Sequence, residues 1–259
     1  MSYKKKISII LFIFCSLITY AQNKHIYKDL QNYGRFGFLV GPAFYQKAEV
    51  KPVFGEYTIE PKMATSFNAG FLYDFHPDKL WSFQTGFYIA HEPADYTDVP
   101  LYAHEYPGLS EDDIISNREK AAFSWSIPMT IRIQKRLGNK LYGQLKGGLR
   151  LMNFQTGSTS GSITINSDEE SRSTVFYIES RTPETNYYAS LLLGGGVSWA
   201  SKWFLLRTDI MYVVNTQPTL EGRYIFTNMI SDDSGGEIKM SGNHFALWLT
   251  FHIKRSKDR

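Results

Sequence analysis

Hydrophobic and polar residues alternate strictly along residues 123–134, which read FSWSIPMTIRIQ. In an extended chain, one face would carry Phe123, Trp125, Ile127, Met129, Ile131 and Ile133. The other face would carry serine, threonine, proline, arginine and glutamine side chains. This period of two indicates a β-strand between two unlike environments. The pattern alone leaves open whether the apolar face lies in a soluble core or against lipid.

The same alternation recurs in seven other segments, and no stretch outside the N-terminus shows a convincing helical period. These segments are residues 35–46, 66–75, 80–91, 141–154, 186–199, 203–214 and 243–254. Aromatic residues make up 15% of the chain, which also favours strands. The sequence therefore predicts an all-β fold of eight antiparallel strands.

The connections between these strands alternate between long and short. Tight turns are expected at residues 76–79, 137–140 and 200–202, and long connections at residues 47–65, 92–120, 155–185 and 215–242. In an up-and-down arrangement all short turns lie at one end and all long loops at the other. Outer-membrane barrels have this asymmetry, with short periplasmic turns and long extracellular loops. We therefore predict an eight-stranded antiparallel transmembrane β-barrel over residues 35–254.

Parts of the long connections also look extended. Residues 162–166 could pair with 173–178, and residues 223–229 with 237–240, as hairpins that project beyond the bilayer. An alternative is a ten-stranded barrel in which the 223–240 region supplies two further strands.

The polar faces of the strands favour a membrane barrel. They combine glycine, serine and alanine with few charges, whereas a soluble exterior carries more charge along each strand. Small residues and scattered charges suit the narrow lumen of an eight-stranded barrel. We predict a salt-bridge network that plugs this lumen, formed by Asp74, Arg132, Lys146, Arg150, Arg207 and Asp209. A narrow anion-preferring path is the alternative, although eight strands normally leave no open channel.

Aromatic side chains flank two of the tight turns. Large amphipathic rings at one height are typical of the interfacial girdles of membrane barrels. The predicted girdle consists of Phe75, Trp81, Trp199 and Trp203.

The N-terminus predicts export. Three lysines at positions 4–6 precede an apolar run at residues 7–18, and a small residue, Ala21, marks the expected cleavage site. We interpret residues 1–21 as a signal peptide, since the run is short for a transmembrane helix; an uncleaved anchor is the alternative. Residues 22–34 would form a periplasmic N-terminal segment and residues 255–259 a basic periplasmic tail. The expected location is the outer membrane of a Gram-negative bacterium.

Removal of this segment changes the charge and cysteine content. The whole chain has a formal net charge of +3, and loss of the three lysines leaves zero, which gives no support for nucleic-acid binding. Cys15, the chain's one cysteine, lies within the segment, so the exported chain is expected to form no disulfide.

No motif predicts a catalytic, metal or cofactor site. The 92–120 connection is rich in histidine and carboxylates, but their spacing matches no metal motif. The 232–237 stretch is interpreted as a turn, and the glycines at 194–196 as a close approach or bend in a strand. Ser241, His244 and His252 show no nucleophile–base spacing. We therefore expect no cofactor, no metal and no enzymatic activity. Pro128 predicts a bulge or irregular pairing in its strand.

Three stretches of the chain support a family resemblance. The SIPMTIRIQ strand, the LQNYGRFGFLVGPAF opening and the export segment ending in AQ resemble the PorT-like outer-membrane β-barrels of the Bacteroidota type. The resemblance covers nearly the whole exported chain and implies fold and compartment. The PorT name comes from a role in protein secretion.

The expected role is structural, adhesive or accessory to secretion or transport. Expected partners are outer-membrane lipid and other envelope or secretion proteins. The alternatives are a lipid-modifying barrel enzyme and a soluble, lipocalin-like ligand-binding barrel.

Overall fold

The computed structural model describes residues 27–106, 112–154, 157–168, 171–182 and 186–255. The predicted signal peptide lies outside these residues, as do residues 22–26 of the predicted periplasmic segment and residues 256–259 of the predicted tail. Among the described residues, no helix combines the length and hydrophobicity needed to cross a membrane.

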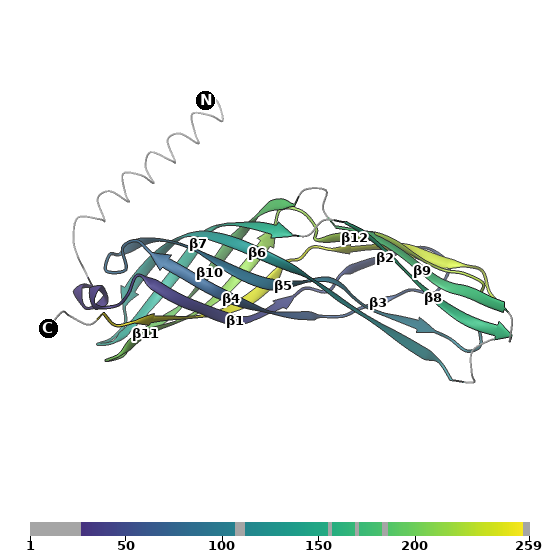
Figure 1. Ribbon diagram of the computed structural model, residues 1–259, viewed down its shortest axis with the longest axis horizontal. Coiled ribbons are helices and arrows are strands. Elements are labelled where there is room, and N and C mark those ends of the chain that lie inside the picture. Colours follow the sequence, from purple (N-terminus) through teal and green to yellow (C-terminus); the bar gives the residue numbers. More distant parts are fainter. Residues whose placement is uncertain (1–26, 107–111, 155–156, 169–170, 183–185, 256–259) are drawn as a thin grey trace, which may run out of the picture.

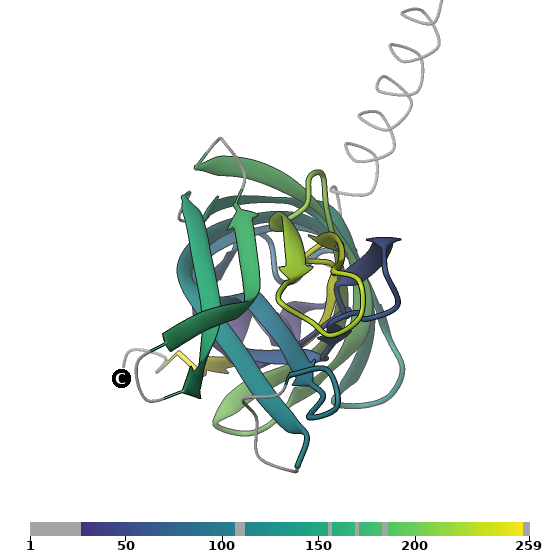
Figure 2. The same ribbon diagram turned by 90° about the vertical axis from the view of Figure 1, so that its right-hand side faces the viewer.

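Eight antiparallel strands close into a ring (Figures 1 and 2). Each strand pairs with the next ring strand along the chain, and β1 pairs with β14 to close the circle. The all-β, antiparallel, up-and-down prediction is therefore confirmed. The ring consists of β1 (Phe36–Tyr45), β4 (Ala64–Asp74), β5 (Trp81–Leu101), β6 (Ile114–Arg136), β7 (Leu141–Phe154), β10 (Tyr187–Ala200), β11 (Phe204–Asn215) and β14 (His244–Ile253).

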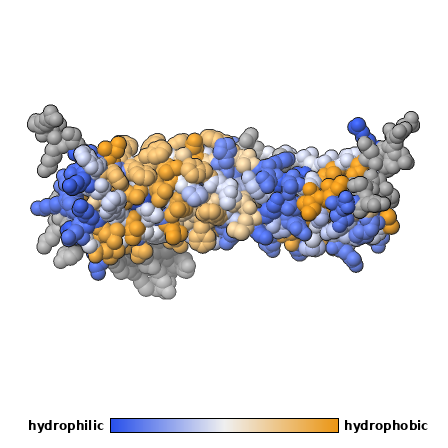
Figure 3. Space-filling view, turned by 90° about the horizontal axis from the view of Figure 1, so that it is seen from below, coloured by the Kyte–Doolittle hydropathy of each residue, from blue (hydrophilic) through white to orange (hydrophobic). Residues whose placement is uncertain are grey.

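Side chains alternate between the two sides of the ring wall, as the period of two requires. In β10, for example, Leu191 and Leu193 are exposed on the outside while Ser190 and Leu192 are buried inside. The outward side chains form an apolar surface around the ring half of the molecule (Figure 3). Residues 123–134 follow this pattern, because Arg132 is fully buried and Phe123 is exposed.

The long connections predicted from the sequence are mostly strand, which corrects that expectation. Strands β5 and β6 contain 21 and 23 residues and continue well past the ring. The short strand β3 (Glu60–Pro61) pairs with the extended part of β5. A separate five-stranded sheet has the order β2 (Glu49–Phe54), β13 (Ser234–Met240), β12 (Leu220–Phe226), β9 (Ser171–Arg181) and β8 (Ser158–Asp168).

The two predicted outer hairpins are confirmed as β8–β9 and β12–β13. The ten-stranded alternative is wrong, because β12 and β13 pair with β9 and β2 and not with the ring. We call the five-stranded sheet and the extensions of β5 and β6 the head. Its buried core includes Val99, Leu101, Tyr106, Val175, Phe176, Ile178, Tyr224, Phe226, Ile238 and Met240. These aliphatic and aromatic side chains remove a large apolar area from water, and the same cluster continues into the ring through residues such as Leu192, Met211 and Trp248, so head and ring share one core.

A short 3₁₀ helix, η1 (Lys28–Asn32), covers the turn end of the ring (Figure 1). Leu30 is buried together with Tyr27 and Tyr33 against ring residues, including Tyr142 and Leu205. The Tyr27 hydroxyl donates to the carbonyl of Gln134 at 3.0 Å. The described part of residues 22–34, predicted as a periplasmic segment, therefore packs against one end of the ring and closes it. We call η1 with its flanking tyrosines, Tyr27 and Tyr33, the plug.

Pro128 interrupts the ladder on one side only. It pairs with Arg150 of β7 in regular register, whereas the β5–β6 pairing has a gap at Ile127 and Pro128 without a shift of register. The Thr85 hydroxyl donates to the Pro128 carbonyl at 2.9 Å across this gap. The predicted irregularity is thus present, but no bulge forms there.

Candidate functional site

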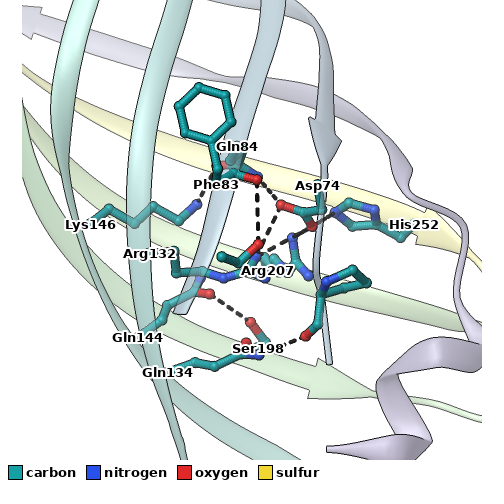
Figure 4. Close-up of polar contacts among 12 residues, drawn as sticks. Asp74, Phe83, Gln84, Arg132, Gln134, Gln144, Lys146, Ser198, Arg207 and His252 are labelled. Atoms are coloured by element: carbon teal, nitrogen blue, oxygen red, sulfur yellow. Dashed lines mark hydrogen bonds and ion pairs between the residues drawn. The ribbon is translucent and has the colours of Figure 1, made fainter. Parts of the chain in front are cut away.

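Five predicted lumen charges meet near the turn end of the ring, and Figure 4 shows four of them, Asp74, Arg132, Lys146 and Arg207. We call them the aspartate cluster: Asp74, Arg132, Lys146, Arg207 and Asp209. The Asp74 carboxylate lies at the end of β4 and accepts hydrogen bonds from Arg132 Nη1 at 3.3 Å and from Arg207 Nη1. Gln84 Nε2 donates to the same carboxylate at 3.0 Å. One carboxylate from one strand therefore ties together three other strands of the ring.

The second carboxylate of the aspartate cluster, Asp209, forms an ion pair with Lys146. The ammonium of Lys146 lies 2.5 Å from Asp209 Oδ2 and 3.1 Å from Gln84 Oε1. Gln144 donates to the other Asp209 oxygen, and the Ser198 hydroxyl donates to Gln144. All five charged side chains are fully buried or nearly so. Removal of ions from water costs several kcal/mol each, so this cluster depends on its pairing.

The hydrogen bonds of His252 define its tautomer and charge. Its Nδ1 lies 3.0 Å from the carbonyl of Gly34, which can only accept, so Nδ1 carries the proton. Its Nε2 lies 3.1 Å from Arg207 Nη1, which can only donate, so Nε2 is the acceptor. His252 is therefore neutral and adds no positive charge to the three cations of the cluster.

The sixth predicted lumen charge belongs to a separate group nearer the head. Arg150 donates from Nη1 to Glu92 at 3.3 Å and to Tyr88 at 3.2 Å, and from Nη2 to Ser190 at 3.2 Å and Asn215 at 3.0 Å. The Tyr45 hydroxyl also donates to Glu92. We call this group the glutamate cluster. Its one cation and one carboxylate balance, and every nitrogen of its guanidinium is engaged.

Glu92 was not among the predicted lumen charges, because residues 92–120 were expected to form a loop. The signal was nevertheless present, because Glu92 continues the inward parity of Gln84, Tyr88 and Ala90 along the same strand. Extension of that alternation by one step would have placed the carboxylate beside Arg150 in the lumen.

Glycine creates room for the buried charges. Gly196 faces the lumen beside Asp209, where a Cβ atom would lie 2.8 Å from the carboxylate oxygen Oδ1. Any larger residue at this position would displace the partner of Lys146. The run of glycines at 194–196 therefore permits a close approach within the wall, as the sequence suggested.

The predicted girdle residues lie where the tight turns place them. Phe75 follows β4, and Trp81 begins β5 and is half-buried. Trp199 is the last residue but one of β10, and Trp203 directly precedes β11. Phe75, Trp199 and Trp203 are exposed on the outer surface, with Trp203 78% exposed. All four residues lie at the turn end of the ring.

The exposed face of the head sheet carries an ordered pattern of charge. Each of four adjacent strands places a basic residue two positions after a glutamate: Glu49 and Lys51, Glu237 and Lys239, Glu221 and Arg223, and Glu179 and Arg181. The register sets every glutamate opposite a basic residue of its neighbour. We call this face the charge grid. A hollow of about 540 Å³ lies over three of its four strands, β9, β12 and β13.

Two loops of the head are joined through Glu105. Its carboxylate accepts from the Tyr57 hydroxyl at 2.6 Å and from the backbone N–H of Ser231 at 2.9 Å. The hydrogen bond from Tyr57 is the main cause that lowers the pKa of Glu105, and the same bond raises the pKa of Tyr57 to about 12. A carboxyl whose pKa is lower in the folded chain adds stability above its unfolded pKa and loses it as the pH falls. A phenol with a raised pKa adds stability below its unfolded pKa and loses it as the pH rises.

We expect the hydrogen bond between Tyr57 and Glu105 to hold the two loops together between about pH 4.5 and pH 10, which are the ordinary pKa values of the two groups. Limited proteolysis of the folded protein from pH 3 to pH 7 would measure this effect. Cleavage near residues 102–106 should increase below about pH 4.5. The Glu105→Gln variant should be cleaved equally across this range. If its cleavage increased below about pH 4.5 as in the wild type, the assignment to Glu105 would be contradicted.

The side chains considered for catalysis do not assemble. His244 and His252 lie at opposite ends of β14, and His244 stacks on Tyr45 with its Nδ1 2.9 Å from the Gly242 carbonyl. Ser241 Oγ accepts from the backbone N–H of Asn243. Among the described residues, no three His, Cys, Asp or Glu side chains gather in a way that could hold a metal ion.

No protein-family model matches the chain, and no curated protein matches it. The outer membrane protein OprG from Pseudomonas aeruginosa has a solved structure that aligns at 8% identity and a TM-score of 0.41, over 87% of this chain and 98% of that chain. A deltaS2 mutant of the monoaromatic hydrocarbon channel TodX aligns at 8% identity and a TM-score of 0.25, over 87% and 72%. The eight-stranded assignment therefore rests on the strand pairing within this chain.

Proposed function

We propose that the protein is a plugged outer-membrane β-barrel that holds its head at the cell surface as an adhesive or secretion-accessory platform. The observation that carries this proposal is the distribution of apolar surface. Large apolar side chains cover the outside of the ring, and the head is predominantly polar outside (Figure 3). Six charged side chains of the sequence prediction are buried inside the ring, together with apolar residues.

The outer surface of the ring has the chemistry of a lipid contact. Soluble monomers rarely expose continuous apolar patches larger than a few hundred Å². Ring strands of 10 to 14 residues, such as β1 and β10, also match the 9–11 residues that a tilted strand needs to span a bilayer. The exposed apolar side chains include Phe38, Phe71, Leu145, Leu149, Leu191, Leu193, Ile210 and Phe251. A lipocalin-like soluble barrel would need the reverse arrangement, so this alternative is disfavoured.

The interior favours a sealed barrel. The aspartate cluster and the glutamate cluster join strands across the lumen, apolar side chains such as Leu192 and Trp248 are buried inside the ring as well, and the plug covers one end. The head core continues from the other end of the lumen. An eight-stranded barrel is just wide enough for side chains to fill, so this interior supports anchorage and not transport through the lumen.

The charge grid supports an extracellular binding role. It is exposed, has equal numbers of acidic and basic residues and lies on a rigid sheet. Such a face suits a hydrated, polar partner, because depletion of apolar side chains leaves little hydrophobic driving force. The resemblance to PorT-like barrels makes an envelope or secretion protein the first candidate partner.

Planar-bilayer recording tests the sealed barrel. The folded exported chain, inserted from detergent, should give no current steps above the lipid baseline at 1 M KCl, because paired side chains block the lumen. Insertion is checked by protease protection of the ring in the same preparation. Reproducible ohmic steps from protected, folded protein would contradict the proposal and favour a channel.

A further inference from the structure

The two arginines of the aspartate cluster leave the same edge of their guanidinium groups unused. Arg132 and Arg207 each contact Asp74 through Nη1 alone. Within the described part of the chain, Nε and Nη2 of both residues have no hydrogen-bond partner. The Nε and Nη2 atoms of one guanidinium form a planar fork of parallel N–H groups, which is the geometry that chelates an anion.

Arg150 shows that the lumen can supply protein hydrogen-bond acceptors for every nitrogen of a buried guanidinium. Its Nε, Nη1 and Nη2 all donate to protein oxygens within the glutamate cluster. All three arginines are fully buried in the same lumen. The difference is therefore local to Arg132 and Arg207. An unpaired buried donor costs about 1–3 kcal/mol, and more when it is charged, so two unused forks require a further acceptor.

The formal charge of the aspartate cluster also indicates that an anion is needed. Three cations face two carboxylates, and His252 is neutral, so one positive charge is unbalanced. Asp78, the other buried carboxylate at this end, lies on the β4–β5 turn and accepts a hydrogen bond from Gln31 of the plug. A single negative charge placed between the two arginines would neutralise the cluster.

Two threonines lie next to these arginines on the strands. Thr130 precedes Arg132 by one inward position on β6, and Thr250 lies opposite Arg207 in the β11–β14 pairing. Both side chains are buried, and their hydroxyl oxygens have no hydrogen-bond partner among the described residues. Hydroxyl groups beside the guanidinium forks add donors for an anion, and the nearest carboxylates, Asp74 and Asp209, are engaged by Arg Nη1 atoms, Gln84, Lys146 and Gln144.

We propose that the lumen binds one chloride-sized monovalent anion between the Nε–Nη2 edges of Arg132 and Arg207. The monovalent charge follows from the unbalanced cation. The small size follows from the complete burial of both arginines and both threonines. The anion acts as an internal counterion that locks β6, β11 and β14 together, and this role is independent of what the head binds.

The wild-type chain provides two tests, with bromide and chloride as probes. Crystals of the folded protein grown in sodium bromide should show an anomalous peak within hydrogen-bonding distance of both forks. In detergent, replacement of sodium gluconate by chloride at constant ionic strength should raise the unfolding midpoint, by roughly 5–10 °C at 100 times Kd. Ordered water at the forks together with a chloride-independent midpoint would overturn the proposal.

Matched variants locate the effect. Arg207→Lys removes one fork but keeps the charge, so the chloride-dependent rise should disappear. Arg150→Lys alters a guanidinium of the glutamate cluster and should keep the rise, whatever its own stability. Equal chloride dependence in the two variants would contradict the site, and if Arg207→Lys does not fold, the wild-type map and titration decide the question.

Discussion

Asp74→Ala is expected to lower the free energy of unfolding by about 3–5 kcal/mol, the largest effect of any single change in the lumen. The substitution leaves Arg132 and Arg207 buried with no direct carboxylate partner, and it also frees the amide of Gln84. Denaturant unfolding from lipid vesicles or detergent micelles, followed by tryptophan fluorescence, measures the loss.

Two further variants separate loss of charge pairing from a general defect. Glu119→Ala removes an exposed ion pair with Lys62 and should change the free energy by less than about 0.5 kcal/mol. Addition of Arg207→Met to Asp74→Ala should recover part of the loss, because a buried cation is removed together with its missing partner. A loss below 0.5 kcal/mol for Asp74→Ala would show that the aspartate cluster does not hold the lumen.

Leu193→Lys is the second large effect and tests the outside of the ring. Leu193 lies in the middle of β10 and is 58% exposed. A lysine near the midplane of a bilayer costs about 2–4 kcal/mol, because the ammonium loses its water. On a protein surface in contact with water, the same substitution at an exposed leucine would change the free energy of unfolding by no more than about 0.5 kcal/mol. Folding into lipid vesicles with and without the substitution measures this difference.

Val53→Lys is the matched control for that measurement. Val53 lies on β2 of the head and is 61% exposed, close to the value for Leu193. Its replacement should leave folding into vesicles unchanged within about 0.5 kcal/mol. Equal and small effects at both positions would mean that the apolar surface of the ring does not face lipid.

The ring was predictable because a single rule governs it. Period-two alternation is read directly from residues such as Phe123 to Gln134, and it fixes which side chains face each side. The lumen charges followed from the same parity, since Arg132 and Lys146 occupy polar positions on apolar strands. Their partners did not follow, because pairing across a lumen depends on the register between strands.

The head and the plug were harder to predict for different physical reasons. Three strands of the head, β2, β12 and β13, contain only 6 or 7 residues, and β2 contains Pro52, so the composition of these segments resembles that of a loop. The Glu-x-Lys and Glu-x-Arg repeats of the charge grid were visible in the sequence, but their meaning emerges only from antiparallel pairing. The plug depends on Tyr27 and Leu30, whose burial is set by distant ring strands and not by local sequence.

The central claim is that the ring spans the outer membrane with the head outside the cell, and single-cysteine labelling tests it most directly. The chain has one cysteine, Cys15, within the predicted signal peptide, so new cysteines give an unambiguous signal. Arg223→Cys lies on the charge grid, where the native side chain is 83% exposed. Asn139→Cys lies on the exposed tight turn between β6 and β7.

In intact cells, a membrane-impermeant maleimide should label Arg223→Cys, whereas it should label Asn139→Cys only after the outer membrane is opened. Labelling of both positions in intact cells, or of the turn alone, would contradict this account.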